Sequence, residues 1–537
     1  MNDREPFIYI KQMYMKGFFD LEENCKEKII SEDYWDFIIP LYRDEELKEV
    51  NPENACIQEM DFGYKSVSVD RRILLPLSFR EYWYSTIPKC YTLLDMQPLD
   101  AAGIITLQNY PTLQLMGDGI MIGFLDTGID YQNRVFRNLD GTTRIVGIWD
   151  QTIQTGRTPQ GLYYGTEYTE EMINAALRSE DPLQIVPSVD TDGHGTFVAS
   201  AAAGGAEVGK QFLGAAPEAS IAMVKLKPAK NYLKEFFAIA QDAVCYQEND
   251  IMLGIKYAES FVRLFERPVV ICLGLGTNQG DHAGNSSLSR YLSSLAVRRS
   301  RAAIVCGGNE GNASHHYHGR LSTQTSEESS RDVEIRVSEG CIGFWLELWG
   351  ALPDAFNLNI RTPGGENIPE LRLGLQQSVT YSFIYEKSRV TIDSALVEEN
   401  SGEELILVRI QDPTPGIWTF RVSASGSLYN GNFHMWLPIT EFLSTPVYFL
   451  NPDPDMTLTE PSMAPEVLSV STYNAENNSF YAESGRGFGR TGQIRPDLSA
   501  PGVNISTIDG CRTGSSMAAA ITAGAVAQFF QWSVIEG

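Results

Sequence analysis

The stretch GSSMA at residues 514–518 decides the fold once it is placed beside two earlier stretches, LDTGI at 125–129 and DGHGT at 192–196. Each combines one reactive side chain with glycine or another small residue, and the reactive side chains are Asp126, His194 and Ser516. Small neighbours let the backbone come close to a reacting centre. A nucleophile, its base and a carboxylate that orients the base are what acyl transfer by a serine hydrolase requires. The three stretches therefore predict one catalytic site.

Each stretch has an ordinary interpretation when it stands alone. An Asp-Thr-Gly after an apolar run is a generic strand and turn; aspartic proteases also carry it, but a second copy would be expected and none exists. A lone His194 is typical of a structural or surface histidine, and Ser516 before Met-Ala-Ala-Ala is typical of the start of a buried helix. Because three coincidences in one order are improbable, the catalytic interpretation is favoured.

Composition and charge narrow the classes of partner. The 537 residues leave room for two or three domains, and 43% hydrophobic with 20% charged residues is typical of a folded globular protein. The net charge of −26, with no run of five Lys or Arg, disfavours nucleic acid and anionic membranes as partners. A protein or peptide partner is the expectation that remains.

The N-terminal sequence does not predict secretion. A basic region followed by an uninterrupted apolar core is missing from residues 1–20, because Lys11 and Lys16 interrupt it. The most apolar stretch, 517–532, is rich in Ala and Gly and contains Thr522, which favours a helix buried in a protein core over a membrane span. We therefore expect a protein that stays inside the cell.

The cysteines and clustered histidines give no metal or cofactor signal. None of the eight cysteines forms a C-x-x-C pair, so without a secretory signal they are expected to be mostly free and reduced. The run HHYH at 315–318 could in principle bind a metal, but an exposed loop is the favoured interpretation. No metal site and no cofactor are predicted.

From residue 116 onward, short β-branched runs alternate with small-residue helical runs, which is typical of an α/β domain. The expected strands are 119–125, 145–149, 220–227, 268–275 and 302–307, and 234–262 is expected to form one long amphipathic helix. Strand–helix–strand alternation implies a parallel sheet, in which active residues gather at the carboxyl ends of the strands.

The pattern changes near Ser322. Eight short alternating runs with no helical window follow: 333–337, 342–349, 356–360, 379–384, 390–392, 405–410, 418–422 and 434–437. They predict an all-β sandwich or jelly roll over 323–462. Because it lies between Asn309 and Ser516, which are 207 positions apart (516 − 309), it is expected as an insertion in the α/β domain, whose second part is 463–537.

The order Asp, His, Ser, with HGT after the second and SMA around the third, resembles the subtilisin-like serine proteases, and PDLSAPGV at 496–503 resembles the segment before their nucleophile. The resemblance implies that Asn309, in GGNEG, donates into an oxyanion hole; alone it would be taken for a turn residue. It also implies that the substrate lies along Leu273, Gly274, Leu275 and Gly276, although these glycines could equally serve a turn, and that Gly307 and Gly308 line an open P1 pocket.

Two blocks, IPKCYTLLD at 87–95 and GFLDTGIDY at 123–131, together with the β insertion, are similar to the Csp group of clostridial subtilisin-like proteases. Spore-associated members of that group process the zymogen of a cortex-lytic enzyme during germination. The resemblance implies a small α/β prodomain over 1–96 that can stay bound after autoprocessing near residues 80–97, with 97–322 as the first part of the catalytic domain. Strands are expected at 55–60, 64–69 and 73–75, and an independent substrate-binding domain is the alternative.

The chain departs from the family pattern at two places. The usual G-T-S-M-A is here GSSMA, where Ser516 is the better nucleophile because Met517 follows it. Only 21 residues follow Ser516 (537 − 516), so the resemblance implies a chain that stops short of the family's length. A catalytically silent sensor or scaffold and a subtilase unrelated to spores are the competing interpretations, and the expected location is cytoplasmic or spore-associated.

Overall fold

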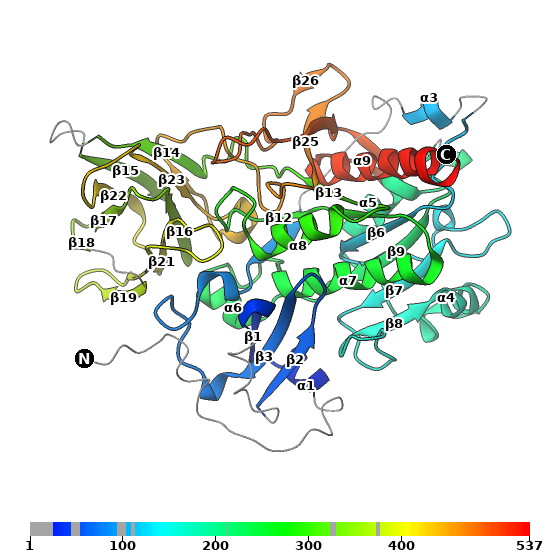
Figure 1. Cartoon of the computed structure of the whole chain (residues 1–537), viewed down its shortest axis with the longest axis horizontal. Coiled ribbons are helices and arrows are strands. Elements are labelled where there is room, and N and C mark those ends of the chain that lie inside the picture. Colours follow the sequence, from blue (N-terminus) through cyan, green and yellow to red (C-terminus); the bar gives the residue numbers. More distant parts are fainter. Residues whose placement is uncertain are drawn as a thin grey trace.

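The computed structural model describes residues 25–43, 54–93, 104–108, 113–210, 212–322, 329–371 and 376–537. Figure 1 shows a central sheet covered by helices towards one end of the long axis and a two-sheet region at the other, with a small N-terminal sheet below both.

The central sheet has nine strands in the order β26-β25-β13-β11-β6-β9-β7-β8, with β27 beside β25. Its strands are β6 (Met121–Asp126), β7 (Ile145–Asp150), β8 (Thr166–Thr169), β9 (Ser220–Lys225), β11 (Val269–Leu273), β13 (Arg301–Cys306), β25 (Leu468–Asn474), β26 (Ser479–Phe480) and β27 (Leu498–Pro501). Pairing is parallel from β25 to β7 and antiparallel at β8 and β26. Continuous apolar runs such as VVICL in β11 suit strands that are buried on both faces.

Helices cover both faces of this sheet. The helices are α3 (Ile104–Gln108), α4 (Glu170–Leu177), α5 (His194–Ala203), α6 (Asn231–Phe236), α7 (Glu248–Phe265), α8 (Ser287–Ala296) and α9 (Ser515–Phe530). Small residues of α5 and α9 pack into one core, and apolar residues of α7 and α8 pack into another. The expectation of one helix over 234–262 is wrong, because the chain leaves α6 at Phe237, adds strand β10 (Tyr246–Gln247) and begins α7 only at Glu248.

Helix α9 and the π-helical turn after it, Ser515–Ile535, form the one segment of the described residues that is long and apolar enough to cross a membrane. Its first half is fully buried against α5 and the central sheet. Burial in the protein core accounts for the apolar composition of that half, whereas Phe529, Trp532, Val534 and Ile535 in the second half are exposed.

The described residues between 316 and 449 form two antiparallel sheets packed face to face. One has the order β14-β23-β16-β21-β20-β19 and the other β18-β17-β22-β15-β24. The strands are β14 (His316–Arg320), β15 (Ser330–Val337), β16 (Gly343–Gly350), β17 (Phe356–Arg361), β18 (Asn367–Leu371), β19 (Gln376–Ser382), β20 (Arg389–Ala395), β21 (Glu404–Gln411), β22 (Gly416–Ala424), β23 (Asn432–Trp436) and β24 (Val447–Phe449). Each of the eight expected runs overlaps a strand, and one apolar core lies between the sheets.

The prediction that the run HHYH at 315–318 forms an exposed loop is wrong. His316 begins β14 and is buried, and its Nε2 lies 3.1 Å from Nδ1 of His434 on β23. His318 stacks on His434 at 4.5 Å between ring centroids, and His282 stacks on Trp436 at 4.0 Å. Among the described residues no group of three or more His, Cys, Asp or Glu side chains is placed to hold a metal ion.

This histidine stack should make stability fall with acidification. Burial lowers the pKa of His282 to about 4, of His316 to about 3 and of His434 to about 2, each below the value near 6.5 of an unfolded chain. Below pH 6.5 the unfolded chain therefore binds more protons, and each histidine lowers the free energy of unfolding by about 1.4 kcal/mol per pH unit. Urea unfolding of wild type and His434→Gln between pH 7.5 and 5 measures this. The variant should depend less steeply on pH, and parallel curves would contradict the assignment.

The N-terminal part forms a three-stranded antiparallel sheet, β1-β3-β2, from β1 (Tyr34–Pro40), β2 (Ala55–Glu59) and β3 (Tyr64–Asp70), with α1 (Cys25–Ile30) beside it. We call residues 25–93 the N-terminal unit. The strand expected at 73–75 is wrong, because a 3-10 turn, Arg71–Ile73, and irregular chain stand there. A disulfide joins Cys25 to Cys56, and the other six cysteines are free.

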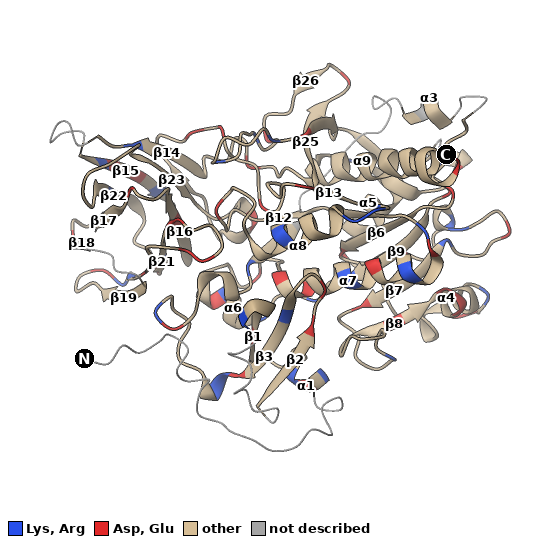
Figure 2. Ribbon diagram, in the orientation of Figure 1, with Lys and Arg blue, Asp and Glu red and all other residues tan. Residues whose placement is uncertain are grey.

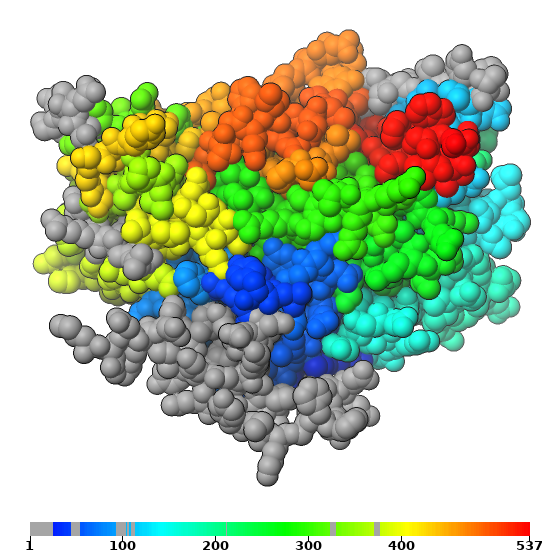
Figure 3. Space-filling model, in the orientation of Figure 1, coloured from blue at the N-terminus to red at the C-terminus, as the bar shows by residue number. Residues whose placement is uncertain are grey.

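The N-terminal unit packs against both other parts of the molecule. Figure 3 shows its blue surface directly beside the green and yellow surfaces of the central and two-sheet regions. One apolar cluster joins Phe37 and Phe79 of the unit, Leu233 of α6 and Trp345 of β16. In Figure 2 basic residues are scattered among acidic ones over the described elements.

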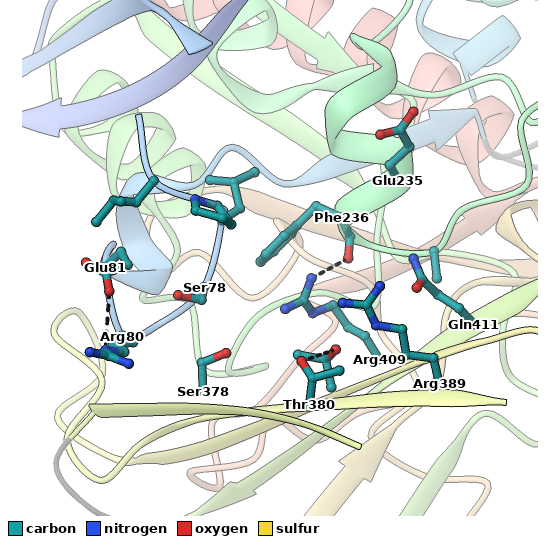
Figure 4. A pocket seen from close by; sticks show the side chains of 15 residues that line it. Ser78, Arg80, Glu81, Glu235, Phe236, Ser378, Thr380, Arg389, Arg409 and Gln411 are labelled. Atoms are coloured by element: carbon teal, nitrogen blue, oxygen red, sulfur yellow. Dashed lines mark hydrogen bonds and ion pairs between the residues drawn. The ribbon is translucent and has the colours of Figure 1, made fainter. Parts of the chain in front are cut away.

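A cavity of about 360 Å³ lies at this junction (Figure 4), between the loop at 75–81, the end of α6 and the outer face of β19–β21. Two of the three arginines that line it have partners: Arg409 donates to the Phe236 carbonyl at 3.1 Å, and Arg80 lies 3.3 Å from the Glu81 carboxylate.

Candidate active site

Asp126 and His194 come together because β6 ends and α5 begins at the same edge of the sheet. Asp126 is the last residue of β6, and His194 is the first residue of α5. Gly195 allows the close approach of the two elements, since a Cβ there would lie 2.2 Å from the Gly128 carbonyl oxygen. The sequence therefore places glycine where the loop after β6 touches the first turn of α5.

The three side chains form a hydrogen-bonded row. Nδ1 of His194 lies 2.8 Å and 2.9 Å from the two carboxylate oxygens of Asp126, and Nε2 lies 3.1 Å from Oγ of Ser516. An ionised carboxylate can only accept, so the proton of the neutral ring is on Nδ1 and Nε2 is free to take the hydroxyl proton. All three side chains are buried.

Ser516 stands in the first turn of α9, where backbone N–H groups and the helix dipole favour negative charge. The backbone N–H of Ser515 donates to Oδ1 of Asn309 at 3.1 Å, which leaves Nδ2 as the donor end of that amide. Burial raises the pKa of the Cys306 thiol, at the end of β13, to about 12. That thiol stays protonated and does not compete as a nucleophile.

The segment Leu273–Gly276 passes directly beside the serine. A Cβ on Gly274 would lie 2.9 Å from Cβ of Ser516 and 3.6 Å from Cε1 of His194, so only glycine fits. Leu275–Gly276 form the short strand β12, which pairs with β4 (Cys90–Leu93) in antiparallel register, Gly276 with Thr92 and Leu275 with Leu93. An extended segment of the N-terminal unit therefore occupies the strand edge on which a substrate is expected.

Gly307 and Gly308 lie in the loop after β13. A Cβ on Gly308 would come within 2.6 Å of the Thr459 side chain, and one on Gly307 within 2.8 Å of the Leu458 side chain. The chain returning from the two-sheet region thus packs directly on these glycines, and the prediction that they line an open P1 pocket stays a prediction.

Two carboxylates near the site were not singled out from the sequence. Asp190 accepts from Thr127 Oγ1 at 2.8 Å and from the Thr196 backbone N–H at 2.9 Å, which ties the loop of Asp126 to the helix of His194. The N-cap of α5 is Gly193, three residues later, so the capping pattern of the sequence does not mark Asp190. The second is Glu310, next to Asn309.

Comparison with known proteins gives two findings that identify the family as well as the fold. A family model described as the subtilase family, Peptidase_S8, matches residues 117–332 and 430–533. The solved structure of the Clostridium perfringens CspB protease is similar, with a TM-score of 0.70 and 30% identity over 81% of this chain and 88% of that chain.

Other solved structures are more distant. MycP1 from Mycobacterium smegmatis aligns with a TM-score of 0.32 and 11% identity over 83% of this chain and 79% of that chain. MycP1 without its N-terminal propeptide aligns with a TM-score of 0.34 and 13% identity over 80% of this chain and 81% of that chain. No curated protein matches the chain.

Proposed function

The chain belongs to the subtilase family of serine peptidases, and from that premise we propose that it is an endopeptidase whose triad is Asp126, His194 and Ser516. The observation that carries the proposal is the hydrogen-bonded row from the Asp126 carboxylate through the imidazole to the Ser516 hydroxyl. The same side chains at these distances and in this tautomer are what serine acyl transfer needs.

In the proposed reaction, Oγ of Ser516 attacks the scissile carbonyl carbon while Nε2 of His194 takes its proton. Asp126 stabilises the imidazolium that forms, and the ring then gives its proton to the leaving amine. Nδ2 of Asn309 and the backbone N–H of Ser516 stabilise the oxyanion. Water then attacks the acyl-enzyme while Nε2 of His194 takes its proton, and the ring returns that proton to Oγ of Ser516 as the acid product leaves.

We further propose that the chain cleaves itself after the N-terminal unit. The register of β4 on β12 supports this, because the chain direction past Leu93 leads from Leu275 towards Gly274, which touches Ser516. At about 3.3 Å per residue, the scissile bond falls within the next few residues, 94–97. These positions lie outside the described residues and inside the range expected from the sequence.

The contacts of the N-terminal unit support its retention after cleavage. Lys230 of the central region pairs with Asp36 at 2.8 Å, and the Tyr84 hydroxyl donates to Glu347 of β16 at 2.6 Å, all four side chains being buried. Together with the shared apolar cluster, these pairs give the unit one anchor on each of its two neighbours. Its strand on β12 then acts as a bound product that blocks substrate entry.

Intact mass and gel filtration test self-cleavage and retention together. The purified wild type should give two masses that add up to the full chain and one water, with the cut in 94–97, and the two pieces should elute together. Urea should separate them, because no covalent bond joins the pieces. A cut elsewhere, or pieces that separate without denaturant, would contradict the proposed docking.

For physiology, we propose a cytoplasmic or spore-associated protease that activates a cortex-lytic zymogen in germination, which the similarity to the CspB protease supports. Its partners would be a protein substrate and its own N-terminal unit. A catalytically silent sensor is the second candidate; the burial of the triad is the observation that favours it.

A further inference from the structure

The oxyanion loop, residues 307–311, carries a carboxylate in an unusual place. Glu310 follows Asn309 directly, yet its side chain is only 3% exposed and points away from the serine towards the two-sheet region. An ionised carboxylate is buried only where donors surround it. Its partners therefore show what holds the loop.

The Glu310 carboxylate binds two segments of the two-sheet region, the one just before β14 and the connection between β23 and β24. One oxygen accepts from Nδ1 of His315, just before β14, at 2.5 Å. The other accepts from the backbone N–H of Thr440 at 3.2 Å and from its hydroxyl at 3.0 Å, a few residues after β23. The amide of Asn278, in the loop after β12, lies 3.5 Å away. One side chain thus joins the entry of the two-sheet region and its β23–β24 connection to the oxyanion loop.

The backbone of the loop is held separately. The Gly307 carbonyl accepts from the Thr459 N–H at 3.1 Å, the Gly308 carbonyl from the Gly485 N–H at 2.9 Å, and the Gly311 N–H donates to the Glu483 carbonyl at 2.9 Å. These bonds lie on either side of Asn309 and Glu310. Between these backbone hydrogen bonds, the Glu310 carboxylate anchors the loop through its side chain, at the residue next to Asn309.

We propose that Glu310 is a positioning residue for the oxyanion hole, through which the two-sheet region holds Asn309 in place. The inference rests on the proposed function, since it assigns Asn309 the same role. A displacement of about 1 Å can cost roughly 100-fold in rate, and loss of the oxyanion donor itself about 10²–10³-fold. Loosening the anchor should therefore cost about 10-fold.

Saturation kinetics of labelling by a fluorophosphonate probe test this, because the probe needs both the nucleophile and the oxyanion hole. Glu310→Gln should lower the maximal labelling rate about 10-fold and change the half-saturating probe concentration by less than about twofold. Glu334→Gln, an exposed residue of β15, makes the same chemical change away from the site and should label like wild type. Thermal unfolding confirms that each variant is folded.

A double-mutant comparison separates positioning from general support. In the Asn309→Ala background, Glu310→Gln should slow labelling by less than about twofold, because the group that it positions is gone. The same 10-fold loss in both backgrounds would overturn the proposal, as would an unchanged Glu310→Gln. If that variant does not fold, Thr440→Val removes one donor to the carboxylate, and the same pattern of non-additivity is expected.

The two proposals fail in different ways. A folded wild-type chain that is neither cleaved nor labelled overturns the proposed function and this inference with it. A labelled wild type with additive effects overturns the positioning role alone.

Discussion

Ser516→Ala should leave a full-length chain that no fluorophosphonate labels. The hydroxyl that lies 3.1 Å from Nε2 of His194 is the group that forms the acyl-enzyme. The expected loss of activity is about 10⁶-fold, the size known for the serine of subtilisin, a member of the same family. Intact mass before and after the probe measures both cleavage and labelling in one experiment.

Ser515→Ala is the matched control. It is the neighbouring buried serine of the same helix, and its contribution to Asn309 is a backbone N–H that alanine retains. This variant should be cleaved and labelled like wild type. A wild type that is uncleaved and unlabelled, like Ser516→Ala, would favour the silent sensor instead.

Asp126→Asn should lower the labelling rate about 10⁴-fold without unfolding the chain. An amide in place of the carboxylate would donate to Nδ1, so the neutral ring would carry its proton on Nε2, facing the serine. The ring could then no longer accept the hydroxyl proton. The labelling rate at neutral pH checks the effect.

The isosteric change keeps the acceptor for the Thr127 backbone N–H, which donates to Asp126 Oδ1 at 2.7 Å. The unfolding midpoint should therefore stay close to that of wild type. A labelling rate within tenfold of wild type would show that Asp126 does not set the tautomer.

The local sequence predicted the parts of the fold that depend on neighbouring residues. Apolar runs that end in LDTGI or begin after DGHGT specify strand-to-turn and turn-to-helix transitions, and alternation marks strands such as β15 and β22. The prediction of one helix over Lys234–Val262 is wrong because the amphipathic spacing continues across the break between α6 and α7. At that break, β10 pairs with β4 from a distant part of the chain.

The sequence alone thus determined which residues could form the site and that a two-layer β region interrupts the domain. Only the tertiary structure decided that His316 and His318 of HHYH lie on a strand and stack on His434, that Cys25 meets Cys56, that β4 lies on the strand beside Ser516, and that Glu310 turns to His315 and Thr440. Spacing along the chain encodes periodic local structure. These contacts join residues from 5 to 184 positions apart (His315 − Glu310 and Gly276 − Thr92), and their partners are chosen by packing and burial.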